Sequence, residues 1–149
     1  MIQRIQSIFL LLAAGALGGQ FALPYLQTPA DDPARSLTAL ADGVLNPLDN
    51  PGLLGLTGLG ALISLAAIFL FKNRSLQMRL ALVAAGIGIM LLVLLGITVK
   101  NTLDQAPGNG TVNFAFGLGL PVLALLFNWL AARAIRKDEA LVRSMDRLR

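Results

Sequence analysis

Residues 112–132 read VNFAFGLGLPVLALLFNWLAA and carry no charge, whereas residues 133–149 read RAIRKDEALVRSMDRLR, in which nine of seventeen residues are charged. The hydrocarbon core of a bilayer is about 30 Å thick, and about 20 apolar helical residues cross it. The first segment meets this requirement, and the second segment is too charged to enter lipid. We therefore predict that residues 112–132 span a membrane and that Arg133 lies at its surface.

The composition of the whole chain also indicates an integral membrane protein. Of the 149 residues, 56% are hydrophobic and only 13% are charged, whereas a soluble domain has about 25% charged residues. The chain contains neither cysteine nor histidine. This composition excludes disulfides, thiolate metal sites and a histidine acid or base, so we expect no catalytic residue, no metal and no cofactor.

Three further uncharged segments are long enough to cross a membrane, and they lie at about 5–26, 52–71 and 80–99. Backbone groups in lipid must pair within their own segment, which requires helices. We predict an all-α fold in which residues 1–149 form a single membrane domain. The architecture expected is a polytopic, four-transmembrane-helix up-and-down bundle with an outer loop at 27–51 and a cytoplasmic C-terminal helix in the tail at 133–149.

Basic residues are distributed unevenly between the two sides of this arrangement. The start of the chain, the loop at 72–79 and the tail share one side and hold ten of the twelve Lys and Arg residues, whereas Arg35 and Lys100 lie on the other side. Short basic loops stay in the cytoplasm, so both termini are predicted to be cytoplasmic. A cleaved signal peptide is an alternative for the first span, because 13–16 are small residues. It would leave the other spans in the same orientation.

The outer loop contains signals for a short helix. Asp32 followed by Pro33 is typical of an N-cap and a first helical residue, and Gly43 is a stop signal. We predict a short amphipathic helix between them, with a solvated loop as the alternative. Asp31 and Asp32 could hold a cation, but adjacent acids at a helix start more often serve the N-cap and the helix dipole.

The four predicted spans contain no charged residue in their interior. Intramembrane charges usually mark transport pathways, so their absence argues against a proton-coupled transporter. Gln20 and Asn128 are the candidate intramembrane polar contacts, either as interhelical hydrogen bonds or as a polar spot in a ligand cavity. Small residues such as Gly52, Gly55 and Gly58 offer a flat packing strip, and Pro121 is expected to bend the fourth span near its middle.

The charged tail has an apolar stripe at helical spacing. Ile135, Leu141, Val142, Met145 and Leu148 fall roughly on one face. The helix of the fourth span is therefore expected to continue into the tail. The tail then lies along anionic lipid, packs on the start of the chain and the loop at 72–79, or binds a partner.

The opening MIQRIQSIFLLLAA and the closing AIRKDEALVRSMDRLR resemble the two ends of an uncharacterised bacterial family of small four-helix integral membrane proteins, known as a domain of unknown function. The resemblance covers essentially the whole chain. It implies a multi-pass protein of the bacterial inner membrane with cytoplasmic ends, and it supplies no activity or catalytic residue. It also suggests that the two ends pack together, with Arg4 near an acid of the tail.

We expect a non-enzymatic membrane protein that serves as a scaffold or accessory subunit. The alternative is a small oligomeric transporter or lipid-handling protein that uses the Pro121 bend and Gln20 or Asn128. A membrane-embedded enzyme is a third option without a supporting residue set. Expected partners are the bilayer, anionic headgroups at the cytoplasmic face, and a membrane protein or further copies of the chain, and not nucleic acid. The candidate partner or lipid face comprises Arg4, Arg136, Lys137, Asp138, Glu139, Leu141, Arg143, Met145 and Arg147.

Overall fold

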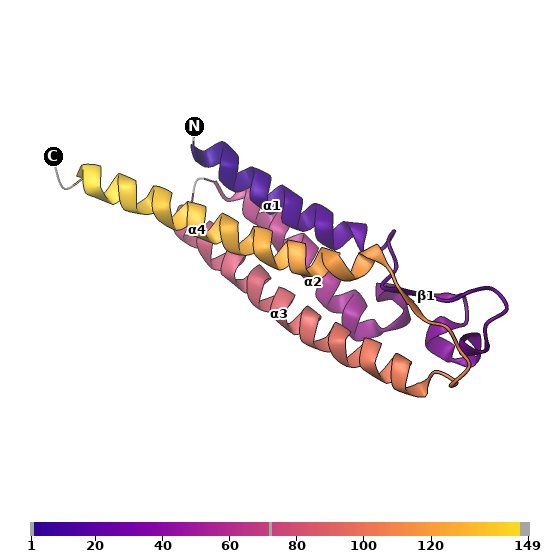
Figure 1. Cartoon of the computed structure of the whole chain (residues 1–149). Helices are drawn as coiled ribbons and strands as arrows, with labels where there is room; N and C mark the ends of the chain where they lie inside the picture. Colours follow the sequence, from indigo (N-terminus) through magenta and orange to yellow (C-terminus); the bar gives the residue numbers. More distant parts are fainter. Residues whose placement is uncertain (1, 72, 147–149) are drawn as a thin grey trace.

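The computed structural model describes residues 2–71 and 73–146, with side chains described over 5–71 and 73–142. Four α-helices dominate this part of the chain: α1 (Ile2–Gly19), α2 (Pro51–Phe69), α3 (Arg74–Gln105) and α4 (Leu120–Asp146). Each helix packs against its neighbour in sequence, and α1 also packs on α4 (Figure 1). The start of α1 and the end of α4 lie at one end of the molecule. We call this the basic end, and we call residues 20–50 and 106–119, which cover the opposite end, the cap.

Three helical segments are long and apolar enough to cross a membrane: Pro51–Phe69, Arg74–Gln105 and Phe116–Val142. The predicted membrane character is therefore confirmed. The apolar helix Ile5–Gly19 is shorter than these three. The helix over the first predicted span ends at Gly19 rather than near residue 26, because the chain turns there through hydrogen bonds such as that from the Leu23 amide to the Gly19 carbonyl.

Helix α3 is longer than the span predicted at 80–99. The side chain of Asn73 accepts a hydrogen bond from the Leu76 amide and so caps the start of the helix. The helix ends at Gln105, two residues before Pro107, as expected near a residue that disfavours helix. Its 32 residues extend about 48 Å at 1.5 Å per residue, which exceeds the apolar layer.

Helix α4 begins later than the span predicted at 112–132. Because it starts at Leu120, Pro121 lies in its first turn, where the missing amide proton costs nothing. The predicted bend at Pro121 in the middle of the span was therefore wrong. The helix then continues without interruption from the apolar segment into the charged tail as far as Asp146, as predicted.

The cap contains a small sheet that the sequence analysis did not predict. Strand β1 (Leu26–Gln27) lies in the middle, between β2 (Val44–Leu45) and β3 (Asn113–Phe114), and both pairings are antiparallel. Leu26 is opposite Leu45 on one side and Phe114 on the other. The fold is thus mostly helical rather than purely α, and the sheet joins the α1–α2 connection to the α3–α4 connection.

The outer loop forms 3₁₀ turns instead of the predicted amphipathic α-helix. They are η1 (Pro33–Ser36), η2 (Thr38–Leu40) and η3 (Pro47–Asp49), and a fourth such turn, η4 (Phe116–Gly119), precedes α4. The predicted N-cap at Asp32 is confirmed, since Asp32 caps η1. Gly43 has a positive φ of 87°, which suits the predicted stop signal. Between them the chain breaks at Leu37, which has extended backbone angles and separates the two turns.

Two apolar clusters hold these elements together. The larger cluster joins the cap to the four helices and includes Tyr25, Leu26 and Leu40 from the cap with Leu53 and Leu91 from α2 and α3. The second cluster lies towards the basic end and combines residues of all four helices: Leu10, Ala67, Ala81, Ala131, Ala132 and Ile135. The cap is therefore packed on the helices rather than loosely tethered to them.

Candidate functional site

Asp32 ties the two connections of the cap together. Its Oδ1 accepts a hydrogen bond from the Ala34 amide at 2.8 Å, and its Oδ2 accepts one from the Thr111 amide at 2.8 Å. Thr28 adds a bond from its hydroxyl to the Thr111 carbonyl at 2.8 Å. The bonds from Ala34 and Thr111 hold the pKa of Asp32 below its ordinary value. The carboxylate therefore serves as an N-cap and a cross-link.

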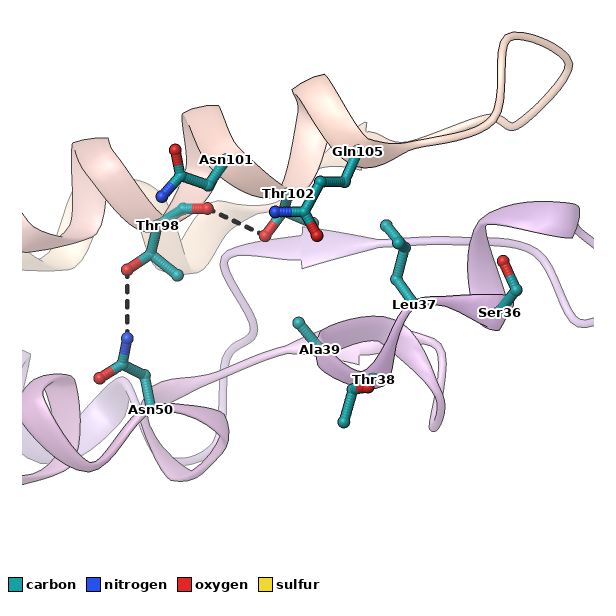
Figure 2. A pocket seen from close by; sticks show the side chains of 9 residues that line it. All are labelled: Ser36, Leu37, Thr38, Ala39, Asn50, Thr98, Asn101, Thr102 and Gln105. Atoms are coloured by element: carbon teal, nitrogen blue, oxygen red, sulfur yellow. Dashed lines mark hydrogen bonds between the residues drawn. The ribbon is translucent and has the colours of Figure 1, made fainter.

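A polar cavity of about 350 Å³ lies between the cap and the last turns of α3 (Figure 2). Three separate segments form it: the outer loop, the residue before α2, and α3. Asn50 donates a hydrogen bond to the Thr98 hydroxyl at 3.4 Å, and Thr98 donates in turn to the Leu94 carbonyl at 2.9 Å. The lining residues are Ser36, Leu37, Thr38, Ala39, Asn50, Thr98, Asn101, Thr102 and Gln105.

The polar cavity contains donors and acceptors but no ionisable side chain. Asn101 and Gln105 lie one turn apart on α3 and share a face. Ser36 and Thr38 come from the outer loop, which lies opposite α3 in Figure 2. Within the described part of the chain, these four side chains form no hydrogen bond with the protein. The cavity can therefore accommodate a neutral hydrogen-bonding group, and it supplies no acid, base or nucleophile with an activating partner.

The two predicted intramembrane amides are buried and engaged with other side chains. Asn128 of α4 accepts a hydrogen bond from the Ser64 hydroxyl of α2 at 3.1 Å. Gln20 accepts a bond from the Tyr25 hydroxyl at 2.5 Å, while its own Nε2 has no partner in the described part of the chain. Asn128 thus links two helices, whereas Gln20 lies just beyond the end of α1 and holds the chain where it enters the cap.

At the basic end, α4 is fixed to two other helices. Gln6 of α1 donates a hydrogen bond to the Ala134 carbonyl at 3.4 Å. Arg74, at the start of α3, forms an ion pair with Asp138 at 3.3 Å. The chain's two ends therefore pack together at Gln6, as expected. Among the described residues, the tail acid Asp138 pairs with Arg74, which lies in the loop predicted at 72–79.

The residues predicted to form a partner or lipid face do not form one continuous surface. Arg136, Lys137 and Leu141 are exposed, Glu139 is half-buried, and Asp138 is buried towards α3. Helical geometry explains this division, because Asp138 is on the face of α4 that meets the other helices. The remaining predicted residues lie outside the described side chains: Arg4, Arg143, Met145 and Arg147.

A groove between α3 and α4 was missed by the sequence analysis. Its apolar part has a volume of about 550 Å³, with Gly86 and Ile89 on one wall and Leu126 and Trp129 on the other. Leu82 and Trp129 also line an adjoining cavity of about 250 Å³ that contains Arg133 and Arg136. Each helix therefore carries a stripe of residues three or four apart that changes from apolar to basic. This signal was present in the sequence, but it has meaning only once the two helices are known to be adjacent.

Within the described residues, no group of three or more His, Cys, Asp or Glu side chains lies close enough to hold a metal ion. Fold and surface define a helical membrane protein with a structured cap and a basic end. The chain belongs to the family described as a domain of unknown function (DUF4293), whose match covers residues 2–148. No curated protein and no solved structure matches it.

Proposed function

We propose that this chain is a non-enzymatic protein of the bacterial inner membrane that crosses the bilayer four times. Its basic end faces the cytoplasm and serves as a scaffold or accessory surface for a partner protein. The observation that carries this proposal is the fixed junction of α1, α3 and α4 at the basic end. Gln6 and Arg74 hold α4 there, so the charged residues beyond it are presented from an ordered platform.

Helix lengths support the proposed crossing of the bilayer. The 18 residues of α1 extend about 27 Å, close to the roughly 30 Å apolar core. The 27 residues of α4 extend about 40 Å, which is longer than the core. Since charge begins at Arg133, the excess length of α4 falls at its basic end, and Figure 1 shows its last turns extending past the start of α1.

The test is recovery of a partner with the tagged full-length protein in mild detergent, followed by mass spectrometry. We expect a stoichiometric protein with the wild type and its loss when Leu141 and Met145 are both changed to Asp. Leu141 is 43% exposed on α4 and belongs to neither buried apolar cluster. The control variant is Leu48→Asp, which makes the same kind of change at an exposed position of the cap. A partner that is recovered equally with the Asp variant would contradict the proposal.

The second candidate function is lipid handling. The groove between α3 and α4 favours it, because an apolar channel that opens onto arginines suits an amphipathic ligand. The transport alternative that relies on Pro121 and the two amides stays a prediction. Pro121 forms no mid-helix bend, and Gln20 and Asn128 accept hydrogen bonds from the protein itself.

A further inference from the structure

The groove between α3 and α4 combines two environments along one path. Its apolar part is lined by Leu82, Ala85, Gly86, Ile89, Val122, Leu125, Leu126 and Trp129. The second cavity shares Leu82 and Trp129 with it and adds Arg133 and Arg136. A third cavity of about 350 Å³ shares Arg136 and adds Arg79. The three cavities therefore form a continuous surface that is hydrophobic towards the membrane centre and cationic towards the basic end.

Gly86 leaves space in the α3 wall of the apolar part. A Cβ atom at Gly86 would meet no other atom within 4 Å, and the residue is exposed. The same holds for Gly96, which lies further along α3 and does not line the groove. A larger side chain at Gly86 would thus occupy the groove without colliding with the protein. Gly96 provides a matched position outside the groove.

The cationic part retains a positive charge. Arg133 lies over the Trp129 ring, 5.6 Å from its centroid, so the guanidinium is held at the mouth of the apolar groove. Asp138, the nearby acid on α4, is paired with Arg74 instead. Glu139 lines the third cavity beside Arg79 and Arg136. The lining residues therefore include three arginines and one carboxylate.

We propose that this groove is a binding site for one anionic phospholipid. An acyl chain lies in the apolar part, and the phosphate lies against Arg133 and Arg136, with Arg79 beyond them. Arginine suits this role, because its planar guanidinium binds phosphate oxygens through paired hydrogen bonds. Basic pockets between membrane helices are also where anionic headgroups bind. This inference is independent of the proposed partner protein, and it gives the lipid-handling alternative a defined ligand class.

Charge complementarity favours a lipid over a second copy of the chain in this groove. Copies inserted in one membrane share the same orientation. A two-fold contact through this face would therefore bring the arginines of both copies together at one membrane surface. Like charges placed opposite one another across an interface disfavour it. An anionic headgroup satisfies the same arginines.

The experiment is lipid titration of the full-length protein in mild detergent, with native mass spectrometry to count bound molecules. The probes are phosphatidylglycerol and phosphatidylcholine with identical acyl chains. We expect one phosphatidylglycerol to bind the wild type in preference to phosphatidylcholine. Changing Arg133 and Arg136 together to Gln should weaken phosphatidylglycerol binding by roughly 30-fold and abolish the preference. Gly86→Leu should remove binding of both lipids.

Two control variants make the result specific. Arg35→Gln combined with Lys100→Gln removes two positive charges outside the groove, and Gly96→Leu adds the same side chain elsewhere on α3. Both should bind phosphatidylglycerol as the wild type does. The proposal is overturned if the wild type shows no preference between the lipids. It is equally overturned if either groove variant binds phosphatidylglycerol as well as its control.

Discussion

At the scale of single residues, Gly117 has no room for a side chain. A Cβ atom there would lie 2.3 Å from the carbonyl oxygens of both Leu23 and Pro24. These are backbone atoms, so no flexible side chain can move to relieve the overlap. The Gly117 amide also donates a hydrogen bond to the Pro24 carbonyl at 3.0 Å. Glycine is therefore what allows the segment before α4 to lie against the segment after α1.

We expect Gly117→Ala to destabilise the protein by roughly 1–3 kcal/mol, since the backbone must shift to admit the methyl group. The measurement is thermal unfolding in detergent, with hydrogen exchange of the cap as a local probe. Gly119→Ala is the control, because a Cβ atom at Gly119 would meet nothing within 4 Å. Equal melting temperatures for the two variants would show that the close approach at Gly117 is not required.

At the scale of elements, the cap depends on bonds between connections that are distant in sequence. Asp32 of the α1–α2 connection binds the Thr111 amide of the α3–α4 connection, and strand β3 pairs with β1 across the same boundary. The backbone bond from Ala34, and that from Thr111, favour the ionised form of Asp32 and so lower its pKa. The stability of the cap should therefore respond to pH through this carboxylate.

The sign of the pH effect follows from the lowered pKa. The stabilisation by Asp32 is fully present above its ordinary pKa of 3.8 and is lost as the pH falls through the lower folded-state value. We expect Asp32→Asn to be less stable than the wild type near neutral pH and to converge with it in strong acid. Thermal unfolding measured across this pH range checks the prediction. Asp31→Asn, which removes the same charge from the adjacent residue, is the control variant.

At the scale of the whole molecule, the proposed threading puts the cap outside the cell and the basic end inside it. The chain has no native cysteine, so each single introduced cysteine reports its own location. In intact cells, a membrane-impermeant maleimide should label Ser36→Cys and Gln105→Cys at the cap. It should label Lys137→Cys and Gln3→Cys only after permeabilisation. Labelling of Gln3→Cys from outside, with Lys137→Cys protected, would refute a crossing by α1.

Much of the helical part of the fold could be predicted from the sequence because lipid imposes a simple rule on apolar segments. Hydropathy and length identified 52–71, 80–99 and the core of 112–132 as helical. The same rule was wrong at the ends of segments. Residues 113–114 are uncharged and were placed in the fourth predicted span, yet they form a strand. Their pairing partner in β1 is far away in the sequence and is adjacent only in the folded protein.

Packing faces were also only partly predictable. Gly55 and Gly58 belong to the helix-packing strip that was predicted for the second span. A Cβ atom at either position would meet nothing within 4 Å. The buried face of α2 carries Thr57, Gly60 and Ser64. Small residues occur on several faces of this helix, so composition alone could not identify the one in contact. The polar cavity and the α3–α4 groove were missed for the same reason, since each is formed by segments whose adjacency is set by tertiary structure.

The central position of β1 in the sheet has a consequence for biogenesis. Strands β1 and β2 both leave the ribosome before α2, whereas β3 follows α3. In the proposed topology, the first two strands can pair as soon as they are exported, but one edge of β1 stays open until the third helix has been inserted. The sheet can therefore be completed only after every preceding segment has crossed the membrane in the correct direction. A chain with a misinserted third helix would keep β3 on the wrong side of the membrane and display an unpaired strand edge to quality-control proteases.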